Sequence, residues 1–371
     1  MKITNPQIKK LRSDLSFLTL NLRKTIFPKN IDVCQPQSER IDTVLFNGKI
    51  RKRKRIVLLS PGCSIATCTM CPLPNEAIDP KCKRITVDDM ITQVKNAFAK
   101  HKKSTYEVVT IYTNSNFFVD DDIPSSVREY IYEEVAKSPA KYLVVESLPQ
   151  FITEKEIKHI KKTLGKKKLS VAIGLQSSND MVRELAINST CTKKGFEKTV
   201  KLLTKYGYYS QVFLMIKPPF LLEKEAIKDT VNSIKYLTKF NIKDPILCAT
   251  RVAPDTLVNL LYKKQLFTSP YLWTIVEILK QAKKLSPKSK PRVAVGELHP
   301  EDNPGSTCTS NHHTCDKKII KSIEKYNKDH KISELNKIKC SCLDEYINFM
   351  DQEIPKWQDL SIPDRIKSFL K

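Results

Sequence analysis

The sequence has no run of 18 or more apolar residues, the length that a membrane-spanning helix requires. Its first residues, Met1 to Asn5, lead into a polar stretch and not into the apolar segment of a signal peptide. It also has no evident internal repeat or low-complexity tract. We therefore expect a globular protein that resides in the cytoplasm and is not attached to a membrane.

Acidic residues are scarce relative to basic ones. The chain has 64 lysines and arginines against 40 aspartates and glutamates, which gives a formal net charge of +24. This excess favours a polyanionic partner such as nucleic acid, although a genome-wide bias towards lysine would produce the same number. Clustering supports the first interpretation, because a basic run lies directly before a cysteine motif and predicts an RNA-binding segment. The run consists of Arg51, Lys52, Arg53, Lys54 and Arg55.

Eleven cysteines are present, and the cytoplasm keeps thiols reduced, so metal ligands and buried thiols are expected in preference to disulfides. Three of them form a C-x4-C-x2-C motif after the apolar run 56–59: Cys63, Cys68 and Cys71. Three thiolates can hold three corners of a [4Fe–4S] cluster and leave the fourth iron open to a substrate or cofactor. The alternative is a structural zinc site, which needs a fourth ligand. Neither Cys82 nor His101 lies close enough to the motif in sequence to be an obvious fourth zinc ligand.

The remaining cysteines divide into two groups. Isolated cysteines at 34, 191 and 248 are expected to be core thiols. The carboxyl-terminal ones are clustered, at Cys308, Cys315, Cys340 and Cys342. Their spacing suggests a structural zinc site, in which His312 or His313 could replace a thiol. A second iron site, an oxidation-prone thiol cluster and ordinary buried cysteines remain as alternatives.

Short apolar runs alternate with segments of helical periodicity, as in an α/β protein with a parallel sheet. Six candidate strands cover 56–59, 107–112, 142–145, 169–175, 211–216 and 246–252. Six such strands predict a partial parallel (β/α)6 barrel with helices on its outer face. Asn47-Gly48 predicts a hairpin turn before the first of them. We expect an amino-terminal extension (1–50), a core (51–298) and a Cys-rich carboxyl-terminal segment (299–371).

Polar residues follow the predicted strands, and the carboxyl ends of parallel strands converge at one edge of a sheet. Together these groups suit a cofactor that contains both an amino acid and a nucleoside. Ser177 could instead cap a helix, and Lys217 could be an ordinary loop residue. Glu146 is more informative, since a carboxylate beside a buried strand needs a partner. The full set of cofactor-binding candidates is Thr113, Asn114, Ser115, Glu146, Gln176, Ser177, Lys217 and Arg251.

These features give the chain a resemblance to radical S-adenosylmethionine (radical SAM) enzymes. Within that superfamily it resembles the archaeosine synthase radical subunit (RaSEA) family, which is related to the elongator-type group. The segments that carry the resemblance are PGCSIATCTMC at 61–71, YTNSNFFVDDDIP at 112–124, VESLPQFITEKEI at 145–157, VAIGLQSSNDMVRE at 171–184 and KPPFLLEKEAIKDTV at 217–231.

The resemblance implies a radical SAM barrel with a [4Fe–4S] cluster on Cys63, Cys68 and Cys71 and S-adenosyl-L-methionine on its open iron. It further implies a lyase that cleaves the C–N bond of a lysine-bearing deazaguanine in the tRNA D-arm to form archaeosine. No individual catalytic residue is assigned beyond these ligands. The implied partners are tRNA, an archaeosine synthase alpha (transglycosylase-like) subunit that adds the lysine, and an electron donor.

The sequence departs from the common superfamily pattern in the cysteine motif and at the end of the second strand. Its first two motif cysteines are separated by four residues in place of three, and Met70 replaces an aromatic residue. The glycine-rich motif usual at the end of the second strand is also absent. Thr113, Asn114 and Ser115 would therefore have to hold the methionine ammonium group.

Two other functions are compatible with the sequence. One is a different radical SAM modification of tRNA; acetyl transfer is disfavoured because no acetyltransferase-sized segment follows the barrel. The other is a non-catalytic, zinc-stabilised RNA-binding scaffold, because a fold does not fix function. Anaerobic cluster reconstitution separates them, since the scaffold would carry only zinc.

Overall fold

A computed structural model of the chain describes residues 5–24, 31–78, 84–100, 105–298 and 313–371. The strands within these ranges form one sheet, in which neighbours in sequence are also neighbours in space. β1 and β2 are antiparallel, and each later strand runs parallel to the one before it. The strands are β1 (Ser38–Phe46), β2 (Lys49–Val57), β3 (Val108–Tyr112), β4 (Tyr142–Glu146), β5 (Lys168–Gln176), β6 (Tyr209–Ile216), β7 (Ile246–Ala249) and β8 (Arg292–Val293).

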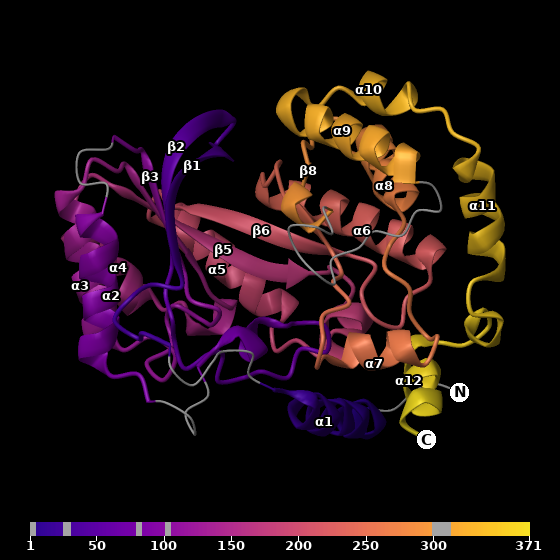
Figure 1. Ribbon diagram of the computed structural model, residues 1–371, viewed down its shortest axis with the longest axis horizontal. Helices are drawn as coiled ribbons and strands as arrows, with labels where there is room; N and C mark the ends of the chain where they lie inside the picture. The colour runs from indigo at the N-terminus through magenta and orange to yellow at the C-terminus, as the bar shows by residue number, and fades with distance from the viewer. Residues whose placement is uncertain (1–4, 25–30, 79–83, 101–104, 299–312) are drawn as a thin grey trace.

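The sheet curls without closing, since β1 and β8 stand at opposite ends of its strand order (Figure 1). This architecture confirms the predicted α/β fold with a partial parallel barrel. The six predicted strands correspond to β2 to β7. β8 was not predicted, because a strand of two residues has no apolar run or alternation to reveal it.

The predicted hairpin turn joins β1 to β2. Asn47 and Gly48 both have positive φ values, 50° and 71°, as a type I′ turn requires. Phe46 and Lys49 form the last pair of the antiparallel register. The hairpin belongs to the same sheet as the parallel strands, although β1 falls within the predicted extension 1–50.

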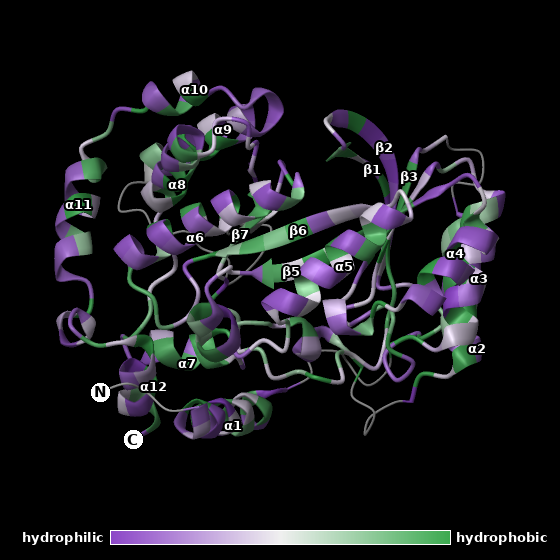
Figure 2. Cartoon of the chain, turned by 180° about the vertical axis from the view of Figure 1, so that it is seen from behind, coloured by the Kyte–Doolittle hydropathy of each residue, from purple (hydrophilic) through white to green (hydrophobic). Residues whose placement is uncertain are grey.

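Helices between successive parallel strands cover the outer face of the sheet (Figure 1). Each has one apolar side; in α5, for example, Phe196, Val200 and Leu203 are buried, as their helical spacing predicts. Figure 2 accordingly shows green and purple residues on the same helices. The α-helices of the described ranges are α1 (Asn5–Leu22), α2 (Val87–Ala99), α3 (Ser125–Lys137), α4 (Glu154–Leu164), α5 (Lys193–Lys205), α6 (Glu223–Leu237), α7 (Leu257–Lys263), α8 (Leu272–Leu285), α9 (His313–Asp329), α10 (Ile332–Asn336), α11 (Cys342–Gln352) and α12 (Ile362–Leu370).

The carboxyl-terminal helices run along one side of the barrel and return to its base. α9 and α10 contact α8, and α12 packs against α1 (Figure 1). Arg365 of α12 pairs with Glu225 of α6 and donates to the Phe220 carbonyl at 2.8 Å. The division at residues 50 and 298 stays a prediction. Within the described ranges, no helix combines the length and apolar character needed to cross a membrane.

Candidate active site

The loop that follows β2 carries three cysteines, Cys63, Cys68 and Cys71. Thr69, between the last two, ties the loop to the end of the short π-helix η3 (Met181–Ala186). Its N–H donates to the Ile187 carbonyl at 3.0 Å, and its hydroxyl donates to the Ala186 carbonyl at 2.8 Å. On the other side, the N–H of Val258 at the start of α7 donates to the Thr69 carbonyl at 3.2 Å. The cysteine loop is therefore fixed to two other segments.

Gly62 gives this loop its entry angle. Its φ is +92°, and a Cβ at this position would lie 2.5 Å from the Cβ of Ala77. Both the backbone conformation and the close approach therefore require glycine.

Arg23, which follows α1, is a second anchor of the loop. Its guanidinium donates to the Ala66 carbonyl at 2.9 Å and to the Cys68 carbonyl at 3.0 Å, and it also bonds the Cys71 carbonyl. Burial lowers the pKa of Arg23, and the nearby thiols of the motif oppose that shift. Sequence reasoning missed this residue, because nothing in its local sequence marks it as a partner of a motif more than 40 residues away.

Burial raises the pKa of the Cys68 thiol well above its usual range, with the neighbouring thiols adding to the effect. Burial also raises the pKa of Cys71 to about 11, against an opposing contribution from Arg23. Thiolates at these positions therefore call for a bound cation at neutral pH.

Asn116 and Asp122 support Cys63 from the loop after β3. The Asn116 side-chain amide lies 3.4 Å from the Cys63 sulfur as a donor. Asp122 is buried and accepts from the backbone N–H groups of Asn116 at 2.9 Å and of Ser64 at 3.0 Å. The sequence marked this loop as polar, but it did not indicate that these two side chains serve the cysteines.

The three cysteines open into a cavity of about 340 Å³ at the carboxyl ends of the strands. Five of the eight predicted cofactor-binding residues line it: Asn114, Ser115, Glu146, Gln176 and Arg251. Thr113 lies just behind it, buried, with its hydroxyl accepting from Ser115 at 3.0 Å. The structure thus brings most of the predicted set together with the cysteines; a cofactor-binding role for it stays a prediction.

Two of these lining residues have a strained backbone. Asn114 follows β3 with φ 54°, and Gln176 ends β5 with φ 63°. Positive φ is uncommon for residues other than glycine and concentrates at functional sites. At both positions the strain accompanies a side chain that borders the cysteine cavity.

Ser177 and Lys217 do not line the cavity. The Ser177 hydroxyl donates to Asp229 at 2.8 Å inside the structure. Lys217 is fully buried, with its ammonium 2.8 Å from both Glu223 and Glu353. The structure gives both side chains partners within the protein.

Glu146 ends β4 and borders both the cysteine cavity and a larger one. Its carboxylate has no hydrogen-bond partner among the side chains and backbone of the described ranges. Burial raises the pKa of Glu146 to about 7, and the positive charge of Arg55 opposes that rise. A carboxyl group that titrates near neutrality in a cavity is a typical feature of a functional site.

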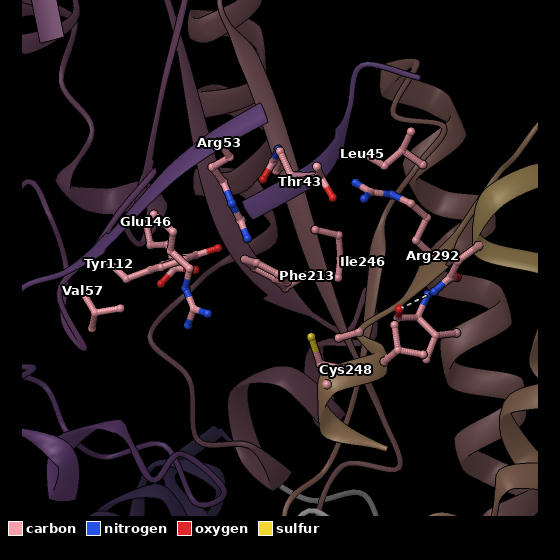
Figure 3. A pocket seen from close by; sticks show the side chains of 18 of the residues that line it. Thr43, Leu45, Arg53, Val57, Tyr112, Glu146, Phe213, Ile246, Cys248 and Arg292 are labelled. Carbon is pink, nitrogen blue, oxygen red and sulfur yellow. Dashed lines mark hydrogen bonds between the residues drawn. The ribbon is translucent and has the colours of Figure 1, made fainter. Parts of the chain in front are cut away.

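The larger cavity, which we call the chamber, has a volume of about 1160 Å³ inside the curl of the sheet. It adjoins the cysteine cavity, since both are lined by Leu73, Asn114, Glu146, Phe213, Cys248 and Arg251. Figure 3 shows Arg53 and Arg292 extending into it from different strands. Cys248 also faces this space, whereas a core position was expected.

The basic run on β2 alternates between the two faces of the sheet. Arg53 and Arg55 line the chamber, whereas Lys54 is fully buried on the other face, 3.1 Å from Glu39. Arg51 pairs with Glu107, and Lys52 is exposed. The run therefore supplies two arginines to the barrel interior and does not form a continuous basic surface; its RNA-binding role stays a prediction.

The carboxyl-terminal cysteines gather at α9 and α11. Cys315 and Cys340 form a disulfide, and the Cys342 sulfur lies 2.9 Å from that of Cys340. This pairing differs from the expectation of reduced thiols, because the Cα atoms are close enough, at 6.7 Å, for a disulfide. The three sulfurs also lie within 4.8 Å of one another, a spacing that could hold a metal ion. Cys308 and His312 lie outside the described residues, and the zinc site stays a prediction.

No family model matches the chain. Among curated proteins, it is 28% identical over 340 residues to archaeosine synthase subunit beta of Methanosarcina acetivorans, covering 88% of this chain and 93% of that protein. It is 27% identical over 301 residues to archaeosine synthase subunit beta of Thermococcus kodakarensis, covering 78% and 88%. The chain resembles the archaeosine synthase beta subunits. This similarity confirms the resemblance found in the sequence motifs.

The chain is also 27% identical over 317 residues to an uncharacterised protein of Methanocaldococcus jannaschii, covering 84% of this chain and 86% of that protein. Among solved structures, Elp3 of Methanocaldococcus infernus matches with a TM-score of 0.46 and 16% identity. That match covers 68% of this chain and 60% of the Elp3 chain.

Proposed function

We propose that this protein is a radical SAM enzyme of tRNA modification, the counterpart of an archaeosine synthase beta subunit. Its reaction would be cleavage of the C–N bond of a lysine-bearing deazaguanine in the tRNA D-arm, which leaves the formamidine of archaeosine. The observation that carries the proposal is the opening of three cysteines from one loop into a cavity that five polar strand-end residues share.

The cysteine loop fits a cluster better than a single ion. Within the described ranges, the group of three metal-binding side chains with ligand atoms inside 4.8 Å is Cys315, Cys340 and Cys342. The three loop cysteines do not form such a group. Sulfurs around one zinc ion would be roughly 4 Å apart, whereas a four-iron cube spreads its thiolates over separate corners.

When bound, a [4Fe–4S] cluster and S-adenosylmethionine together supply a radical that removes a hydrogen atom from a substrate carbon. The protein's own groups have simpler tasks. Arg23 holds the loop carbonyls and Asn116 donates towards the Cys63 sulfur, so the three thiols keep a fixed arrangement.

The residues that line the cysteine cavity are of two kinds: polar groups that could orient a ligand, and apolar side chains. Asn114 and Gln176 offer amide groups to a polar ligand, and Arg251 offers a cation. Apolar side chains of Leu73, Phe213 and Met215 line the same cavity and would limit the water around a bound cofactor.

The proposal includes two partners. The words 'subunit beta' in the names of the relatives suggest a further subunit. By the resemblance to their family, this would be a transglycosylase-like alpha subunit that installs the lysine before this chain acts. An electron donor is also required, because cleavage of the sulfonium consumes an electron.

Mass analysis of tRNA nucleosides tests the proposed reaction. tRNA that carries the lysine adduct is incubated with the reconstituted, reduced protein and S-adenosylmethionine. We expect loss of the lysine-bearing base and an equal gain of archaeosine. An unchanged nucleoside profile, while S-adenosylmethionine is consumed, would point to another tRNA substrate and contradict the assigned reaction.

A further inference from the structure

Among the residues that line the chamber, basic side chains outnumber acidic ones. Basic side chains come from β2, from the end of β7, from β8 and from α9: Arg53, Arg55, Arg251, Arg292 and Lys328. The acidic side chains that line it are Glu76, Glu146 and Glu324. The chamber therefore offers positive charge in a concave space inside the curl of the sheet.

Three of these arginines have an unpartnered donor. The Nε atoms of Arg55, Arg251 and Arg292 are buried and have no hydrogen-bond partner within the described ranges. Arg53 differs, because Asp42 accepts from its Nε and Nη2 at 2.7 Å each. Buried donors are nearly always satisfied in folded proteins, so these three mark guanidinium groups whose hydrogen bonding is incomplete within the described ranges.

The existing ion pairs of these arginines are long. Arg251 Nη1 is 3.6 Å from Glu76, and Arg292 Nη2 is 3.9 Å from Asp244. Arg55 lies over the Tyr112 ring, with its guanidinium carbon 5.4 Å from the ring centroid. Each guanidinium can still form hydrogen bonds to a ligand.

The positions of these arginines distinguish two ends of the chamber: a cofactor end next to the cysteine cavity and a substrate end away from it. Arg251 borders the cysteine cavity as well as the chamber, whereas Arg55 and Arg292 border the chamber alone. Arg292 is also held in place, since the Asn327 side chain accepts from the Val293 N–H at 2.9 Å and donates to its carbonyl at 2.8 Å. This pair of bonds fixes β8 to α9.

We propose that Arg55 and Arg292 bind an oxyanion of the substrate and so act as specificity residues of the chamber. The inference rests on the proposed function, because it takes the occupant to be a tRNA nucleotide that carries a lysine. Guanidinium groups match the oxygens of phosphate and carboxylate. The oxyanion is either the phosphate of the nucleotide or the carboxylate of the lysine adduct.

Binding of four small probes tests this inference on the full chain without any radical step. Guanosine 5′-monophosphate is compared with guanosine, and L-lysine with 1,5-diaminopentane, which lacks the carboxylate. Titrations followed by ligand-observed NMR give each affinity. We expect the anionic member of at least one pair to bind about tenfold more tightly, the effect typical of hydrogen bonds to a charged group.

The variants Arg55→Gln and Arg292→Gln are each expected to remove that preference. Loss of a phosphate preference assigns the site to the nucleotide, and loss of a carboxylate preference assigns it to the lysine adduct. Lys49→Gln is the matched control, because it removes one charge from an exposed position of the same strand, outside the basic run and the chamber lining. The control should keep the preference, which would show that general electrostatics is not responsible.

Arg55→Lys and Arg292→Lys keep the charge and remove the planar donor group, so a partial loss of preference is expected from them. Absence of any preference in the parent protein, or a preference that both glutamine variants retain while folded, overturns the inference. The binding result is independent of the nucleoside assay. If the protein shows the anion preference but forms no archaeosine, the proposed function is contradicted and the oxyanion site is not.

Discussion

Arg23 is the residue whose role in the site is most local and most testable. Its guanidinium holds carbonyl oxygens of the cysteine loop, as outer-shell groups hold metal ligands in other proteins. Arg23→Ala is expected to accelerate loss of iron to a chelator by about 10- to 100-fold after reconstitution. Lys24→Ala, which changes the exposed neighbour, should leave the rate unchanged. Equal rates in both variants would contradict the anchoring role.

Glu146 should make stability depend on pH. Its pKa rises on folding from the usual 4.5 to about 7, so the folded state keeps a proton that the unfolded state releases in this interval. Stability is therefore lost as pH rises from about 4.5 to 7. Glu146→Gln removes this penalty and should raise the free energy of unfolding by about 1–3 kcal/mol at pH 8, but not at pH 4.5. Denaturant titrations of both proteins at the two pH values measure the difference, and an equal effect at both would refute the assignment.

For single residues, the sequence predicts chemical character better than position in the folded structure. The motif spacing predicts a shared ligand role for the three loop cysteines, because such a role depends on local separation, and the structure places all three at one cavity. Lys217 and Ser177 both follow strands, but they have buried partners on another element and do not line the cavity, so their cofactor-binding role stays a prediction. Arg23 and Asp122 could not be found, because their contacts form only after distant segments come together.

Among the elements, the end of β6 is tied to the carboxyl-terminal segment by a buried ion cluster. Lys217 lies between Glu223 of α6 and Glu353, which follows α11. Lys217→Met would leave two buried carboxylates without their cation, and we expect a loss of about 3–5 kcal/mol in the free energy of unfolding. Denaturant titration measures it.

Lys224→Met is the comparison for that variant. Lys224 pairs with Asp351, and both side chains are 60% exposed, so the expected loss is below about 1 kcal/mol. Similar small losses in the two variants would argue against a structural role for Lys217 and would favour the cofactor role first expected of it.

The parallel strands were predictable because both of their faces are buried, which produces continuous apolar runs such as Val108–Tyr112. The course of α9 to α12 was not predictable. The larger of those helices are amphipathic, and their positions depend on long-range partners such as Arg365 with Glu225. Amphipathic patterns show that a helix has an apolar face, but not what the face will contact.

For the whole molecule, the formal charge of +24 should determine how RNA binding responds to salt. Association with tRNA releases counterions, so the affinity should fall linearly with salt concentration on logarithmic scales. Between 50 and 200 mM salt we expect a loss of roughly tenfold to a thousandfold, measured by filter binding. An affinity that does not change with salt would exclude the backbone contacts that the proposal requires.

The central claim is that three loop cysteines hold a four-iron cluster with one open corner. Iron and sulfide content after anaerobic reconstitution tests it most directly. We expect about four irons per chain in the parent and in Cys248→Ala, and near-complete loss in Cys63→Ala, Cys68→Ala or Cys71→Ala. One bound zinc per chain in the parent would contradict this claim. Four irons per chain in any one of the three loop-cysteine variants would contradict it as well.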